Sequence, residues 1–185
     1  MEDAAIVELY WQRSEEAIPE TEYKYGQYCG AIAKNICHSI EDAEECVNDT
    51  WLRAWNRMPS ERPSVLSTFL GAITRNLALD RWRNAHRQKR GGGETDLALE
   101  ELSDCVPAPG GVEREMEAKE LARAIDAFVA SLQPTERRLF LARYWFLTPV
   151  KELAERLSWS QSKTKTTLFR LRKRLLRQLK EEGLC

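Results

Sequence analysis

The chain has 185 residues, of which 43% are hydrophobic and 31% charged, so it is long enough for one ordinary domain or two small helical ones. No apolar stretch reaches the length that crosses a bilayer, and Met1 is followed by acidic residues rather than by a signal sequence. We therefore expect a cytoplasmic protein without membrane insertion. The composition is rich in Leu, Ala, Arg and Glu and includes only nine Gly and seven Pro, which predicts an all-α fold.

The net charge of −1 hides a separation of the two signs along the chain. Residues 1–62 carry 13 acids and 6 bases, and residues 94–127 carry 10 acids and 3 bases. Residues 71–93 instead hold 6 bases and 1 acid, and residues 134–185 hold 13 bases and 5 acids. This pattern indicates DNA contact at two places and a different, basic partner for the acidic stretches.

The first ninety residues predict a small helical domain. Apolar residues at helical spacing run through residues 6–55, with a break at Pro19-Glu20. Ser39 or Glu41 can begin a further helix whose first turn is acidic, where the helix dipole favours anions. Residues 58–67 contain two prolines and three serines and predict a loop, and Thr68 starts the next helix.

Glycines 91–93 end that helix, and acidic, proline-containing sequence then predicts a flexible linker over residues 91–112. A helix from about Glu113 to Ser131 follows, and Pro134 lies in the first turn of another. The expected architecture is two small helical domains, residues 1–90 and 113–185, joined by the acidic linker.

The second domain contains a predicted helix-turn-helix, winged-helix-like but without a wing. Thr148-Pro149 is a cap followed by a first-turn proline for a short helix, and residues 158–160 form the turn. Ser160 caps a second helix from Gln161 to about Lys180. Two helices joined by a three-residue turn make a DNA-reading motif. The expected buried line of the second helix is Thr164, Leu168, Leu171, Leu175 and Leu179.

The second helix carries no acid between Gln161 and Lys180 and eight bases. Helix-turn-helix proteins present the first turns of this helix to base edges, while later bases hold phosphates. The expected groove contacts are Ser162, Lys163, Thr166 and Arg170, with Lys165, Arg172 and Lys173 completing the DNA-binding set. The alternative is an ordinary solvated basic face.

Five cysteines are scattered along the chain, at positions 29, 37, 46, 105 and 185. No pair has the C-x-x-C spacing of a metal site, and a cytoplasmic compartment disfavours disulfides. We expect small buried hydrophobes, no metal and no cofactor. No residue pattern of an active site is present, so no catalytic residue is predicted.

Two separated groups of motifs resemble bacterial RNA polymerase sigma factors of the extracytoplasmic-function (ECF) group, over nearly the whole chain from Leu9 to Leu179. An acidic helix start, a RAW-like element and an R-N-L-A-L-D stretch mark the first domain. The matching segments are Asp42-Ala43-Glu44-Glu45, Arg53-Ala54-Trp55 and residues 69–83, and in the second domain residues 132–134, 143–145, 152–155 and 165–173.

The resemblance implies the partners and the role of each site. The acidic helix would bind the clamp helices of the largest subunit of core RNA polymerase, through Asp42, Glu45, Asn48, Asp49 and Arg53. Trp51 and Trp55 of the same helix are expected in the core.

The next helix would open promoter DNA at the minus-ten element and hold flipped bases, with the loop at residues 62–67 closing their pocket. Its residues would be Arg75, Asn76, Asp80, Arg83 and Arg87. Asp80 could instead form only an ion pair with Arg83. The second domain would read the minus-thirty-five element.

Other features are left open by the resemblance. The linker either mimics nucleic acid in the polymerase channel or is a solvated tether, and the family often has an anti-sigma partner. Ser158 replaces the usual glycine of the turn. Residues 162–167 replace the Gly-Thr-Val-Lys-Ser-Arg sequence with which the family's recognition helix usually opens. Leu147-Thr148-Pro149 suggests that the first helix of the motif starts a residue early.

Two other functions compete with this interpretation. A stand-alone helix-turn-helix regulator would usually need a dimerising or ligand domain, which the sequence does not suggest. A nucleic-acid enzyme is disfavoured because His38 and His86 are isolated and the acids cluster on one helix face.

Overall fold

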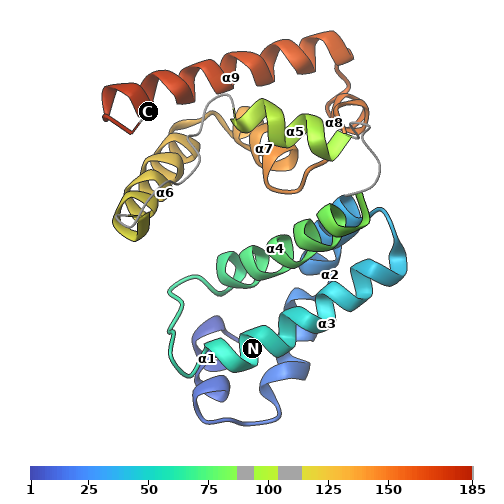
Figure 1. Cartoon of the computed structure of the whole chain (residues 1–185), viewed down its shortest axis with the longest axis vertical. Helices are drawn as coiled ribbons and strands as arrows, with labels where there is room; N and C mark the ends of the chain where they lie inside the picture. Colours follow the sequence, from blue (N-terminus) through green and yellow to red (C-terminus); the bar gives the residue numbers. More distant parts are fainter. Residues whose placement is uncertain (87–93, 104–113, 185) are drawn as a thin grey trace. The chain divides into compact units, whose positions relative to one another are not determined.

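The computed structural model describes residues 1–86, 94–103 and 114–184, and the chain divides into two compact units, Met1–Arg90 and Gly91–Cys185 (Figure 1). Nine α-helices and no strand occur in these described ranges, which confirms the all-α prediction. None of the helices is both long and apolar enough to cross a membrane, as far as the described residues go.

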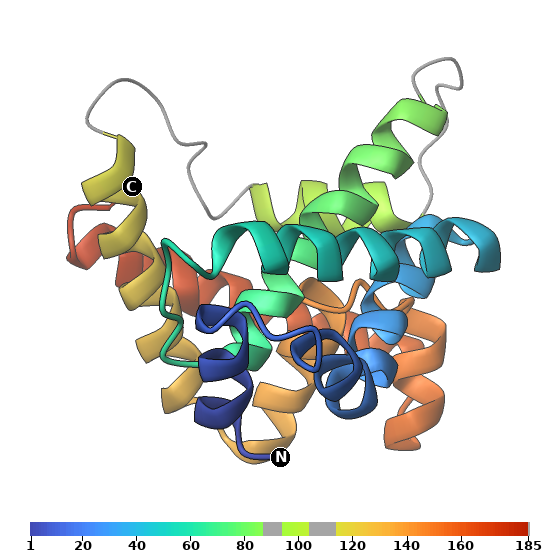
Figure 2. The same cartoon turned by 90° about the horizontal axis from the view of Figure 1, so that it is seen from below.

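The N-terminal unit consists of α1 (Asp3–Trp11), α2 (Ala17–Cys37), α3 (Ile40–Arg57) and α4 (Leu66–His86). Helices α2, α3 and α4 pack on one another and α1 lies against α2 (Figures 1 and 2). Buried threonines lie where α3 and α4 approach each other. Thr50 donates to the backbone of its own helix, is 3.0 Å from Thr74 of α4, and is fully buried. The buried hydroxyl thus has hydrogen-bond partners, and the threonine side chain takes up less volume than a large apolar one.

The start of α3 follows the prediction, because the Ser39 side chain accepts a hydrogen bond from the Asp42 backbone N–H at 3.2 Å. The predicted break at Pro19-Glu20 is wrong: Pro19 lies inside the first turn of α2, where a backbone N–H has no helical partner to lose. The start of α4 was placed too late. The helix begins at Leu66, which is 1% exposed and anchors its first turn in the core.

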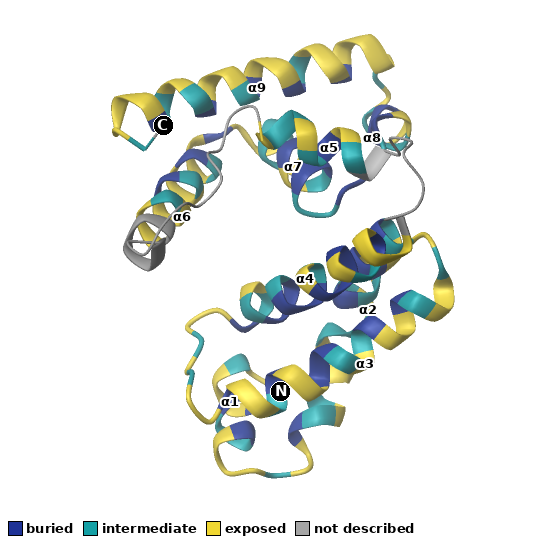
Figure 3. Cartoon of the chain, in the orientation of Figure 1, coloured by how far each residue is buried: buried dark blue, intermediate teal, exposed yellow. Residues whose placement is uncertain are grey.

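The C-terminal unit contains α5 (Glu94–Ser103), α6 (Arg114–Ser131), α7 (Pro134–Tyr144), α8 (Val150–Leu157) and α9 (Gln161–Glu181). An aromatic cluster links α6 to α7: the ring of Phe140 lies 5.5 Å from that of Phe128 and 4.8 Å from that of Tyr144. The predicted buried line of α9 is confirmed, from Thr164 to Leu179, and Figure 3 shows the buried residues of α9 along one side of the helix.

Helices α8 and α9 form the predicted helix-turn-helix, with one boundary shifted. Ser160 caps α9 by accepting from the Lys163 N–H at 3.1 Å. Pro149, rather than Thr148, occupies the cap position of α8, so the helix starts later than predicted. The carbonyl of Thr148 accepts from the buried Arg143 guanidinium at 3.3 Å, and this bond helps to hold the Thr148-Pro149 segment extended.

The flexible linker predicted over residues 91–112 is wrong for residues 94–103, which form α5. The segment is rich in the helix formers Glu, Leu and Ala, and the acidic composition concealed this. Helix α5 packs on α7, with Ala98 fully buried and Leu102 against the core of the unit. Residues 104–112 of the predicted linker lie outside the described residues.

Ser158 has left-handed backbone angles, φ 53° and ψ 40°, as its place in the turn suggested. A left-handed conformation costs an L-residue about 1–2 kcal/mol. Glycine avoids this cost, but it loses more backbone entropy on folding, so a change to glycine recovers only part of it. We expect Ser158→Gly to raise the free energy of unfolding by about 0.5–1 kcal/mol, measured by urea denaturation. The matched change Ser160→Gly removes a cap instead and should lower stability slightly.

Candidate nucleic-acid interfaces and an acidic helix face

The solvent side of α9 forms one candidate DNA interface. Six of the seven predicted residues are exposed on it: Ser162, Lys163, Lys165, Thr166, Arg170 and Lys173. The helix N-terminus adds the positive end of its dipole to these cations. The arrangement suits a phosphate-lined groove, with the first two turns placed to meet base edges.

Arg172 does not join this face. Its side chain is 15% exposed, and one guanidinium nitrogen lies 2.6 Å from the Tyr144 hydroxyl and 3.1 Å from a Glu101 carboxylate oxygen. Glu101 also binds Arg143, which is 1% exposed, at 3.2 Å. Arg172 therefore belongs to a network inside the C-terminal unit that fixes α5 to α7 and α9.

Two aromatic residues beside the basic face were missed by the sequence reasoning. Phe169 is 48% exposed, with the Lys173 ammonium 4.9 Å from its ring centre. Trp159 of the turn carries the Lys163 ammonium 4.1 Å from its ring centre. The helical spacing of Phe169 from Ser162 and Lys173 places it on the polar side of α9 and could have revealed it. Aromatic side chains there can contact thymine methyl groups.

The second candidate DNA surface lies on α4. Asn76, Asp80 and Arg83 are exposed at a spacing that puts them on one face, and Asp80 makes an exposed ion pair with Arg83 at 3.5 Å. Arg75 lies apart from them, on the side of the helix that carries buried Leu79, and burial lowers the pKa of its guanidinium. The predicted contact Arg87 lies outside the described residues.

The loop before α4, expected to close a base pocket, is attached to α1 at its beginning. Arg62 forms an ion pair with Glu8, and its guanidinium lies 4.8 Å from the ring centre of Trp11. This attachment fixes where the loop begins relative to α1.

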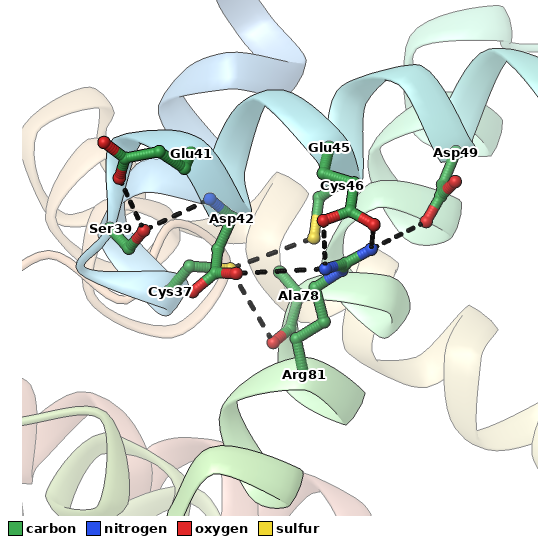
Figure 4. Close-up of polar contacts among 9 residues, drawn as sticks. All are labelled: Cys37, Ser39, Glu41, Asp42, Glu45, Cys46, Asp49, Ala78 and Arg81. Atoms are coloured by element: carbon green, nitrogen blue, oxygen red, sulfur yellow. Dashed lines mark hydrogen bonds and ion pairs between the residues drawn. The ribbon is translucent and has the colours of Figure 1, made fainter.

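Three of the five acidic residues of α3 converge on one cation of α4, which the sequence reasoning missed. Arg81 approaches Asp42 at 3.8 Å, Glu45 at 2.7 Å and Asp49 at 3.1 Å (Figure 4). Its hydrogen bond lowers the pKa of the Glu45 carboxyl and raises that of Arg81. Because three carboxylates share one guanidinium, the cluster keeps a negative charge.

The rest of this α3 face is exposed and combines polar residues with one apolar side chain. Asn48 and Arg53, both predicted as site residues, are exposed, and Leu52 between them is 59% exposed. Trp51 is buried as predicted. Trp55 is half-buried, in edge contact with the Tyr10 ring at 6.1 Å. Leu52 therefore adds an apolar side chain to an otherwise polar and negatively charged surface.

Three cysteines lie in the described ranges: Cys29 and Cys46 are buried, and Cys37 is half-buried. The other two, Cys105 and Cys185, lie outside the described residues. Among the residues that are described, no group of three or more potential ligands could hold a metal ion.

Comparison with known proteins matches both units. Residues 24–88 match the Sigma-70 region 2 family, and residues 122–175 match the Sigma-70, region 4 family. The chain belongs to the sigma-70 family. It is 32% identical over 117 residues to a protein of Xanthomonas campestris pv. campestris named "Probable RNA polymerase sigma factor RfaY". That match covers 62% of this chain and 28% of the relative, so the chain spans little more than a quarter of that protein's length.

The two sigma-70 matches confirm the resemblance predicted from the sequence and coincide with the surfaces described above. The region 2 match includes all of α3 and α4, and hence the Arg81 cluster and the Asn76 surface. The region 4 match includes α7, α8 and most of α9. Helix α5 lies in neither matched segment, so the sigma-70 pattern could not have indicated Glu101.

Proposed function

We propose that this chain is a sigma factor, which binds core RNA polymerase through its N-terminal unit and directs it to promoters. It contributes binding surfaces rather than catalytic groups. The observation that carries the proposal is the acidic, partly apolar face of α3 in a chain that also has a basic recognition helix. Such a face would be repelled by DNA, so it serves a protein partner.

In this proposal the C-terminal unit reads the minus-thirty-five element with α9. Ser162, Thr166 and Arg170 approach base edges in the major groove, and Lys163, Lys165 and Lys173 neutralise phosphates. Salt should weaken this contact strongly, because each neutralised phosphate releases counterions.

The N-terminal unit acts at the minus-ten element with α4. Asn76 offers an amide and Asp80 a carboxylate to the edge of an unstacked base, and Arg83 supplies positive charge for the strand. The weak, exposed Asp80–Arg83 pair costs little to break, so it does not prevent this role.

The exposed face of α3 binds the polymerase, and we call it the polymerase handle. Its partner is the clamp-helix segment of the largest polymerase subunit. Glu45 and Asp49 provide negative charge, Arg81 fixes the orientation of their carboxylates, and Leu52 supplies apolar contact. Carboxylates held in one geometry lose little side-chain entropy when a basic partner binds.

A single exposed side chain tests this handle. Leu52→Ala should leave the free energy of unfolding unchanged within about 0.5 kcal/mol, because the side chain is mostly in solvent. It should weaken binding to core polymerase about five- to tenfold, measured by titration of a fluorescently labelled chain, since truncation of a side chain near the centre of an interface can cost about 1 kcal/mol or more.

The matched control is Ile40→Ala at the start of α3. Ile40 is 62% exposed, against 59% for Leu52, and it lies outside the proposed contact. Equal polymerase affinities for the two variants would contradict a handle centred on Leu52.

A further inference from the structure

Two cysteines that the proposed function does not use lie side by side in the N-terminal unit. Cys37 is the last residue of α2 and Cys46 lies in the second turn of α3, and their sulfur atoms are 3.8 Å apart (Figure 4). A disulfide has an S–S distance of about 2.05 Å, so side-chain rotations that move each sulfur by about 1 Å would close the bond.

The surroundings of the pair favour a thiolate held by its neighbour. A hydrogen bond with Cys37 lowers the pKa of Cys46, and the positive charge of Arg81 acts in the same direction, while burial and the carboxylates of Asp49 and Asp42 oppose it. Cys46 is fully buried, whereas Cys37 is half-buried and gives a small oxidant access to the pair. Cys29 is buried, and burial raises its pKa to about 11.

We propose that Cys37 and Cys46 form an oxidation-sensitive dithiol, which a peroxide converts into an intramolecular disulfide joining α2 to α3 beside the Arg81 cluster. The peroxide oxidises one thiol to a sulfenic acid and releases one water. The second thiol then attacks the sulfenic sulfur, forms the S–S bond and releases a second water. Both thiol hydrogens end in water, and no further oxidant is needed.

The disulfide would close a short loop that contains the Ser39 cap and two members of the acidic cluster, Asp42 and Glu45. A covalent link across this loop restricts its opening. Backbone amides of residues 40–46 should therefore exchange more slowly with solvent in the oxidised chain than in the reduced chain.

Mass spectrometry of the whole chain tests the proposal directly. Cys37 and Cys46 lie on one tryptic segment, residues 35–53, because no Lys or Arg occurs between them. After hydrogen peroxide at a dose that oxidises half of added glutathione, followed by alkylation, we expect this segment to be lighter by two hydrogens and unalkylated. Cleavage after Glu44 or Glu45 should leave its two halves joined until a reductant is added. Cys29 should remain alkylated.

Two variants distinguish a dithiol from two independent thiols. Cys46→Ala should abolish the loss of two hydrogens from the segment and leave Cys37 open to alkylation after the same peroxide dose, and Cys29→Ala should leave the disulfide unaffected. The proposal is overturned if both cysteines of the wild-type segment are alkylated, if Cys37 is oxidised further while Cys46 remains a thiol, or if either cysteine pairs outside the segment. It is also overturned if exchange of residues 40–46 is equal in the two redox states.

Discussion

Replacing Glu101 by alanine is expected to destabilise the C-terminal unit by about 3 kcal/mol, the lower end of the range for breaking a buried ion pair. The change leaves Arg143, 1% exposed, without its carboxylate, and it removes the anion that Arg172 binds. Glu101 itself is 28% exposed, which places the cost at the lower end. The measurement is amide hydrogen exchange of α7 and α9 in the whole chain, which reports on this unit alone.

Glu100→Ala is the matched control, because it removes the same charge from an exposed position one residue earlier on α5. It should change the stability of α7 and α9 by less than about 0.5 kcal/mol. Similar losses in the two variants would mean that helix charge or propensity, rather than the Arg143 contact, holds α5 in place.

Reversing the charge of Arg170 has the second large expected effect. Arg170→Glu should weaken binding of a minus-thirty-five duplex about ten- to hundredfold, because a cation facing the groove becomes an anion. The slope of log affinity against log salt should also fall, since a positive charge close to the phosphates is replaced by a negative one. Fluorescence anisotropy at several salt concentrations measures both quantities.

Arg123→Glu is its control. Arg123 is exposed on α6 and the same charge change is made, but it lies near Glu182 and Leu184, at the opposite end of α9 from the recognition turns. Equal weakening by both variants would show that net charge, rather than the face of α9, governs DNA binding.

Local sequence rules predicted the helices and their caps because the relevant interactions are close in the chain. The apolar line from Thr164 to Leu179 follows from helical spacing, and Ser39 and Ser160 cap helices through N–H groups three residues away. The contacts of Glu101 join it to residues 42 and 71 positions away, and no local pattern encodes them. Arg172 was misplaced for this reason, whereas the linker was misassigned because its acidic composition concealed its helix formers.

The functional surfaces were predicted with similar limits. Charge and motif indicated which helices carry the proposed sites, and most of the chosen side chains are exposed. Arg75 was assigned to the same helix surface as Asn76, although adjacent helical residues point in directions about 100° apart. Arg81 was missed because its three acidic partners lie on another helix, and exposed Leu52 was missed because a single apolar residue outside the buried stripe gives no distinct sequence signal.

Transcription from purified components tests the central claim most directly. The whole chain is added to core RNA polymerase that lacks other sigma subunits, with a library of promoter fragments as template. We predict transcripts with defined start sites, reduced by both Leu52→Ala and Arg170→Glu and retained in Ile40→Ala and Arg123→Glu. An absence of specific transcripts from every fragment, with a chain that is folded and binds duplex DNA, would contradict the proposed function.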